Sequence, residues 1–136
     1  MQIDVDFPGG VRVDAHFGPF TVHTDQSRPD GGEGAAPSPF DLFLTATATC
    51  AGFYVLRFCQ TRGIQAADIH LAQRLEVDPA SGHVTKIMIE IQLPHDFPEK
   101  YRNAVIRAAE QCTVKKHLEQ PPSFEIVATR PEPSLV

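Results

Sequence analysis

The sequence is poor in the residues that mark several classes of protein. It contains no Trp, two Tyr and two Met in 136 residues, and three Cys with no C-x-x-C pair. Small secreted domains held by disulfides carry more cysteines, in even number, so the sequence argues against that class. Basic residues are also few, with Lys plus Arg at 12 against Asp plus Glu at 17 and a net charge of −5. Phosphate contacts need a basic face, so we expect no nucleic-acid partner.

Two further features are missing at the level of segments. The first six residues, MQIDVD, carry acid where a signal peptide carries base and an apolar run, so we expect a cytoplasmic protein. The uncharged run 42–56 is 15 residues long, whereas a membrane-spanning helix needs about 20 apolar residues. Three threonines interrupt this run, and Asp41 and Arg57 flank it. We therefore predict a buried helix and no membrane partner.

The N-terminal part of the chain has the pattern of a small sheet. Apolar residues alternate over residues 2–7 and 11–15, and Pro8-Gly9-Gly10 between them has turn chemistry. Residues 20–24 predict a third strand. Residues 25–37 then lose periodicity and are rich in glycine and acid, which predicts a flexible loop of the kind that often carries binding residues.

A long apolar helix is predicted next. Ser38 is a capping residue, and Asp41 three positions later makes a short version of the capping box. The pattern continues to about Arg62 and ends at Gly63. Because residues 40–58 are apolar on nearly every side, we expect this helix to be buried on most faces.

The remaining elements complete an α+β order. Apolar residues of one parity predict two strands, and Pro79-Ala80-Ser81-Gly82 predicts the turn between them. Helical spacing of apolar residues predicts a second helix. The predicted elements are strands at 69–77 and 87–93, a helix at 96–111, one further turn at 114–118 and a closing strand at 124–128. Strands, a long helix, a hairpin, a helix and a strand indicate a single α+β domain over residues 1–136.

Cys50 and Cys59 are predicted to lie on the same helix but cannot form one site. They are nine residues apart, and at about 100° per residue they face opposite sides. We expect Cys59 to be core filler, as a free cysteine usually is. Arg57, two turns after Cys50, is the one cation on the face that carries Cys50.

Cys112 has a different setting. It continues the apolar stripe of the second helix and is followed by Lys115 and Lys116. Cations and a helix start near a cysteine favour its thiolate, although these two lysines also fit a solvated surface pair. If Cys112 faces Cys50 in an apolar pocket, oxidation of one thiol and resolution by the other become possible chemistry.

Two segments resemble a known family. Residues 37–50, PSPFDLFLTATATC, look like the cysteine helix of the osmotically inducible protein C (OsmC) family, which includes the organic hydroperoxide resistance proteins. Residues 112–118, CTVKKHL, look like the second cysteine motif of that family. The order of the surrounding elements also matches, so the resemblance extends over nearly the whole chain.

The resemblance implies a fold and a chemistry. The fold would be OsmC-like, with antiparallel sheets and a long buried cysteine helix, assembled as an intertwined homodimer with its sites at the interface. Cys50 would attack the O–O bond of an organic hydroperoxide, and Cys112 would resolve the product to a disulfide that an external dithiol reduces. No metal or bound cofactor is implied.

The chain departs from the family pattern at several positions. Hydroperoxide-reducing members pair an arginine from an N-terminal loop with a glutamate ten residues before the first cysteine, where this chain has Phe40. Asp41 lies one residue later, and both Arg12 and Arg28 are candidates for the arginine. Thr113 stands where many members have proline. Two alternatives therefore remain: a non-catalytic dimer that binds a hydrophobic small molecule, and a stress-associated dimer with inert thiols.

Overall fold

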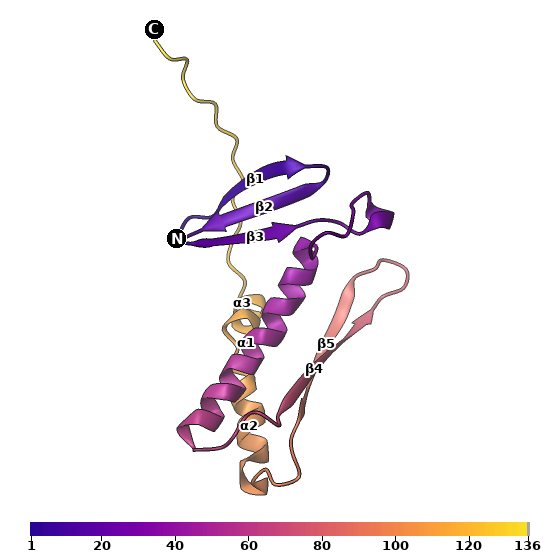
Figure 1. Ribbon diagram of the computed structural model, residues 1–136, viewed down its shortest axis with the longest axis vertical. Coiled ribbons are helices and arrows are strands. Elements are labelled where there is room, and N and C mark those ends of the chain that lie inside the picture. The colour runs from indigo at the N-terminus through magenta and orange to yellow at the C-terminus, as the bar shows by residue number, and fades with distance from the viewer. Residues whose placement is uncertain (136) are drawn as a thin grey trace.

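The computed structural model describes residues 1–135 and has two separate antiparallel sheets, with a long helix between them in sequence and two short helices after the second sheet (Figure 1). A three-stranded sheet of order β1-β2-β3 precedes the long helix, and a β4–β5 hairpin follows it. The prediction of an α+β fold is confirmed. The elements are β1 (Asp4–Gly9), β2 (Arg12–Phe17), β3 (Phe20–Thr24), the 3-10 turn η1 (Arg28–Asp30), α1 (Pro39–Thr61), β4 (His70–Val77), β5 (Val84–Gln92), the 3-10 turn η2 (Glu99–Tyr101), α2 (Arg102–Ala109) and α3 (Thr113–Glu119).

The N-terminal sheet forms where alternating residues predict it. Val5 lies opposite Ala15, and Ala15 lies opposite Val22, so the three strands align in one register. The turn between β2 and β3 contains Gly18 at φ 52°, a left-handed conformation that glycine adopts at little cost. The three predicted strands are confirmed, with shifts of one or two residues at their ends.

The start of α1 also follows the predicted chemistry. Ser38 Oγ accepts a hydrogen bond from the Asp41 backbone N–H at 3.1 Å, and Asp41 Oδ2 accepts one from the Ser38 N–H at 3.0 Å. This reciprocal pair satisfies two backbone donors that the helix itself leaves free. The helix ends at Thr61, and Gly63 follows at φ 65°.

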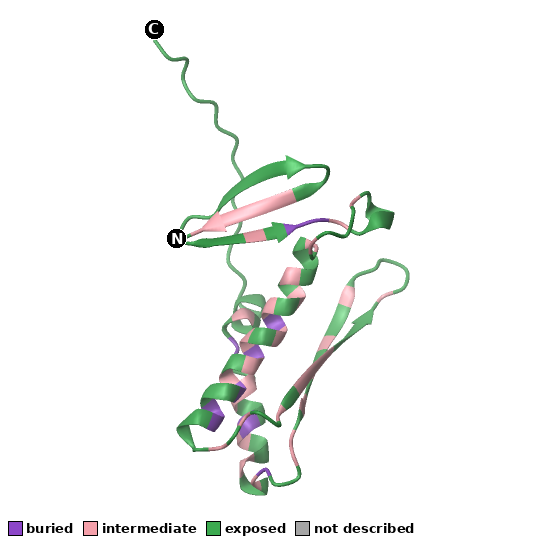
Figure 2. Cartoon of the chain, in the orientation of Figure 1, coloured by how far each residue is buried: buried purple, intermediate pink, exposed green. Residues whose placement is uncertain are grey.

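Burial of α1 differs from the prediction. Only one stripe along the helix is buried, and Figure 2 shows it as separate purple stretches among exposed and half-buried residues. The stripe consists of Thr47, Ala51, Val55, Phe58 and Cys59. The expectation of burial on most faces is wrong for the single chain, because α2, α3 and β4 together cover only part of the helix surface. The exposed apolar side chains on α1 are Phe40, Phe43, Phe53 and Leu56.

By length and composition, α1 is also long and apolar enough to cross a membrane. A single helix of this kind is weak evidence, because the core helix of a globular domain meets the same criterion. Here Val55, Phe58 and Cys59 form the core together with Phe97 and Val105. The absence of a membrane partner stays a prediction.

The second half of the chain departs from the predictions in two places. The helix predicted at 96–111 is shorter, because its first turn is the 3-10 turn η2 after Pro98 and regular helix covers only α2. The closing strand at 124–128 is wrong: Phe124 and Ile126 are 87% and 95% exposed, and the segment extends away from the helices (Figure 1). Its backbone has no strand partner within residues 1–135, so it forms no sheet.

Candidate functional site

Two of the three thiols meet at the start of α3. Cys50 lies in the middle of α1, and Cys112 is the residue that caps α3, where its Sγ accepts a hydrogen bond from the Lys115 backbone N–H at 3.4 Å. The Cys112 thiol and the backbone N–H groups of Thr113 and Val114 face the Cys50 sulfur closely enough to lower the pKa of that thiol. Contacts between α1 and α3 hold these groups together. The site is therefore a pair of thiols surrounded by backbone donors.

The pKa values of the two thiols are shifted in opposite directions, downward for Cys50 and upward for Cys112. Burial raises the pKa of Cys50, but hydrogen bonds from the Val114 N–H, the Cys112 thiol and the Thr113 N–H outweigh it, so the pKa lies below its ordinary value. Burial raises the pKa of Cys112 as well, and the hydrogen bond that Cys112 donates to Cys50 raises it further. The pair therefore holds one proton most favourably as a Cys50 thiolate beside a Cys112 thiol.

Cys59 stands apart from this pair. It is fully buried among Val55, Phe58 and Val105, as the sequence predicts for core filler. Burial raises its pKa, and the opposing effect of Arg62 is smaller. A buried thiol with a raised pKa is a poor nucleophile.

Within residues 1–135, none of the four predicted supporting side chains forms a hydrogen bond or an ion pair with Cys50, and their roles stay predictions. Arg57 is exposed, and the groups that lower the pKa of Cys50 are the Val114 and Thr113 N–H groups and the Cys112 thiol. Arg12 forms an ion pair with Glu33 at 3.9 Å, and the exposed Arg28 lies in η1. Asp41 completes the cap of α1.

The sequence offers only a weak signal for Tyr54, a further residue at this site. Tyr54 is one helical turn after Cys50, and its hydroxyl forms a 2.9 Å hydrogen bond with Thr113 Oγ1. This contact joins the α1 face that carries Cys50 to the first residue of α3. Helical spacing alone places Tyr54 near Cys50, but nothing in the sequence indicates a partner 59 residues away.

The loop between β3 and α1 is held by more hydrogen bonds than its glycine-rich composition predicts. Asp25, which is 2% exposed, accepts backbone hydrogen bonds from Gln26, Glu33 and Ala35 at 2.8, 3.2 and 3.0 Å. These hydrogen bonds lower the pKa of Asp25, and the bond from the Ala35 N–H has the largest effect. A methyl group at Gly32 would lie 2.0 Å from the Gln26 carbonyl oxygen. The expectation of a flexible loop is therefore wrong for the segment around Asp25.

Asp25→Asn is expected to weaken this loop and to change how stability depends on pH. An amide presents an N–H₂ group where one carboxylate oxygen now accepts, so Tm at pH 7 falls by several degrees. The lowered pKa of Asp25 stabilises the fold above the unfolded-state value of 3.8. That stabilisation is lost as the pH falls through the folded-state pKa. Thermal unfolding from pH 7 to pH 3 should show the two proteins converging at the acid end.

The matched control for that measurement is Asp68→Asn, because Asp68 is an exposed acid outside the loop. Its Tm should follow the unmodified protein at every pH. Equal pH profiles for Asp25→Asn and Asp68→Asn would contradict the role given to Asp25.

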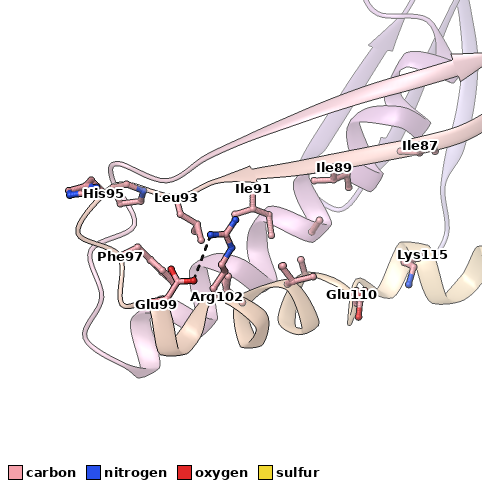
Figure 3. Close-up of a pocket in the computed structure, with 15 residues that line it drawn as sticks. Ile87, Ile89, Ile91, Leu93, His95, Phe97, Glu99, Arg102, Glu110 and Lys115 are labelled. Carbon is pink, nitrogen blue, oxygen red and sulfur yellow. Dashed lines mark ion pairs between the residues drawn. The ribbon is translucent and has the colours of Figure 1, made fainter.

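Two hollows lie between the β4–β5 hairpin and the helices. One, of about 690 Å³, is bounded by β5 and α2, and Figure 3 shows Ile89, Ile91 and Leu93 along its strand side. The Arg102–Glu99 ion pair of 3.7 Å lies at its far end. The other, of about 1220 Å³, is lined by Phe40, Phe43 and Leu118 and reaches Cys112. An apolar space thus adjoins the thiol pair.

Comparison with known protein families agrees with the fold and the thiol pair. The family model for OsmC-like proteins matches residues 31–127, which include both Cys50 and Cys112. The chain belongs to the OsmC-like protein family, in which organic hydroperoxide resistance proteins are also found. No curated protein sequence matches the chain.

Solved structures share the fold at low sequence identity. A candidate osmotic stress induced and detoxification response protein from Psychrobacter arcticus 273-4 has a TM-score of 0.71 and 23% identity over 85% of this chain and 86% of that one. An organic hydroperoxide resistance protein OsmC from Legionella pneumophila has a TM-score of 0.52 and 20% identity over 87% of this chain and 89% of that one. OhrB, an organic hydroperoxide resistance protein of Bacillus subtilis, has a TM-score of 0.50 and 19% identity over 86% of this chain and 90% of that one.

Proposed function

We propose that the protein is a thiol-dependent peroxidase that reduces organic hydroperoxides. The observation that carries this proposal is that Cys50 of α1 and Cys112 at the cap of α3 lie together, and the pKa of Cys50 is lowered there while that of Cys112 is raised. A thiolate is the nucleophilic form of cysteine, and a neighbouring thiol is what resolves its oxidised product. Membership of the OsmC-like family supports the same chemistry.

The proposed reaction has three balanced steps. The Cys50 thiolate attacks the terminal oxygen of R–O–O–H, the O–O bond breaks, and with one proton the products are Cys50 sulfenic acid and the alcohol ROH. The Cys112 sulfur then attacks the Cys50 sulfur, and water leaves as the disulfide forms. An external dithiol reduces that disulfide, restores both thiols and is itself oxidised to a disulfide.

The apolar hollow beside Cys112 supports an organic substrate. Phe40, Phe43 and Leu118 give it a lining suited to an alkyl or aryl group. Phe40 stands where an acid was expected from the resemblance, so substrate binding here depends on apolar contact. Hydrogen peroxide has no apolar group to place in this space, and we expect it to react more slowly.

We further propose that the protein is a homodimer. Its accessible surface is 10766 Å², whereas a compact monomer of this mass exposes about 7,000 Å². The extended C-terminal segment contributes to the excess, and so does the exposed apolar face of α1. The excess is roughly 3,700 Å² per chain, which is more than the roughly 1,000–2,500 Å² that each partner buries in an obligate interface, so the surface is large enough for one.

Titration of the thiols tests the proposed reaction. One equivalent of cumene hydroperoxide per chain is expected to remove two of the three free thiols, and peptide mass spectrometry should identify a Cys50–Cys112 disulfide. Cys59 should remain free. If the three thiols survive several equivalents of hydroperoxide, the protein is not a thiol peroxidase.

The alternative of a non-catalytic binding protein has one observation in its favour, which is the size of the apolar hollow at Phe40 and Phe43. Native mass spectrometry of the freshly purified protein separates the two functions. A retained hydrophobic ligand together with unreactive thiols would favour the binding protein.

A further inference from the structure

We propose that Tyr54 is a positioning residue for the thiol site: its hydroxyl, bonded to Thr113 Oγ1, holds the first turn of α3 against the Cys50 face of α1. The effect of Tyr54 on catalysis rests on the proposed function. Its effect on the position of α3 depends only on the contacts between α1 and α3. Neither cysteine motif includes Tyr54.

The geometry behind this assignment is a short link between two elements. Tyr54 follows Cys50 by one helical turn, so both side chains leave α1 on adjacent parts of its surface. The 2.9 Å bond from Tyr54 reaches Thr113, whose own N–H is one of the donors to the Cys50 sulfur. The hydroxyl contact and the amide contact therefore belong to the same residue.

The link matters because the donors to Cys50 come from one short segment. Thr113 and Val114 supply backbone N–H groups, and Cys112 supplies its thiol. A shift of α3 away from α1 lengthens all three bonds together, and hydrogen bonds weaken steeply with distance and angle. The Tyr54 hydroxyl, through its bond to Thr113, is one of the α1–α3 contacts that keep these donors beside Cys50.

Charged side chains do not offer another explanation for the reactivity of Cys50. On α3, Lys115 pairs with Glu119 at 3.1 Å, Lys116 Nζ contacts the Gln111 side chain, and His117 Nδ1 contacts the Thr113 carbonyl. On α1, Arg57 is exposed. The groups that lower the pKa of Cys50 are the Val114 and Thr113 N–H groups and the Cys112 thiol, and none of them is a charged side chain.

The rate of iodoacetamide labelling at Cys50, followed from pH 5 to pH 10 by peptide mass spectrometry, tests the role of Tyr54. Tyr54→Phe removes one oxygen and keeps the ring. We expect its labelling curve to move to higher pH, with a rate at pH 7 about 3- to 10-fold below that of the unmodified protein. Thr113→Val should give the same shift, Thr113→Ser should restore the original curve, and the double variant should equal either single one.

Tyr101→Phe is the matched control, because it removes the same atom from a tyrosine that packs on Phe58 at the far end of α1. Its labelling curve should coincide with that of the unmodified protein. If Tyr54→Phe leaves the curve of Cys50 unchanged, or if the effects of Tyr54→Phe and Thr113→Val add, the positioning role is overturned.

Labelling needs no hydroperoxide, so its outcome is separate from the proposed function. A curve that shifts in Tyr54→Phe while cumene hydroperoxide leaves every thiol intact supports the positioning role and rejects the peroxidase. Peroxidase activity with an unshifted curve supports the peroxidase and rejects the positioning role.

Discussion

Cys50→Ser is expected to abolish consumption of cumene hydroperoxide, with a loss in kcat/KM on the order of 10³-fold or more. A serine hydroxyl in place of the thiol is not ionised at neutral pH, and the Thr113 and Val114 amides cannot make it nucleophilic. The rate is measured as loss of hydroperoxide with dithiothreitol as the dithiol. Full activity in Cys50→Ser would contradict the assignment of Cys50 as nucleophile.

The other two cysteines provide the internal controls. Cys112→Ser should consume one equivalent of hydroperoxide in a single turnover and leave a Cys50 sulfenic acid that dimedone traps, because no thiol resolves it. Cys59→Ala should stay within about twofold of the unmodified protein, since Cys59 lies in the core away from the pair. Loss of the single turnover in Cys112→Ser would mean that the nucleophile had been assigned to the wrong thiol.

The second large effect concerns assembly. The unmodified protein, at 15.0 kDa per chain, should sediment at about 30 kDa as a dimer. Leu56→Asp places a carboxylate on the exposed apolar face of α1, and burying that charge in an interface should weaken the dimer by roughly 100-fold or more. Sedimentation equilibrium across micromolar concentrations measures both proteins.

Asn103→Asp on α2 is the matched control for assembly, because it adds the same charge at an exposed polar position. It should sediment like the unmodified protein. A 15.0 kDa species for the unmodified protein throughout this range would reject the dimer and leave the apolar face of α1 without an explanation.

Local patterns in the sequence predict much of the fold. The Ser38–Asp41 cap, the glycine turns and the alternating strands depend on residues close together in the chain, so each can be predicted without the structure. The closing strand at 124–128 cannot be assessed this way, because a strand needs a neighbour and the pattern does not say whether one is available. The burial expected for α1 is too high for the same reason.

The sequence likewise predicts some residues of the site and misses others. Spacing separates Cys50 from Cys59, and the resemblance marks Cys112. The donors to Cys50, however, are backbone N–H groups of Thr113 and Val114, which every non-proline residue possesses and no sequence pattern identifies. The sequence therefore directs attention to arginine side chains, where the folded chain uses amides. Asp25 carries no sequence signal because its three partners are also main-chain groups.

The sulfur of Cys112 has two tasks, since it also accepts the Lys115 N–H at the beginning of α3. A disulfide sulfur is a weaker acceptor than a thiol that shares a proton with a thiolate, so oxidation exchanges part of a helix cap for a covalent tether. Because one sulfur serves both roles, the proposed disulfide would couple the redox state of the site to the stability of the first turn of α3.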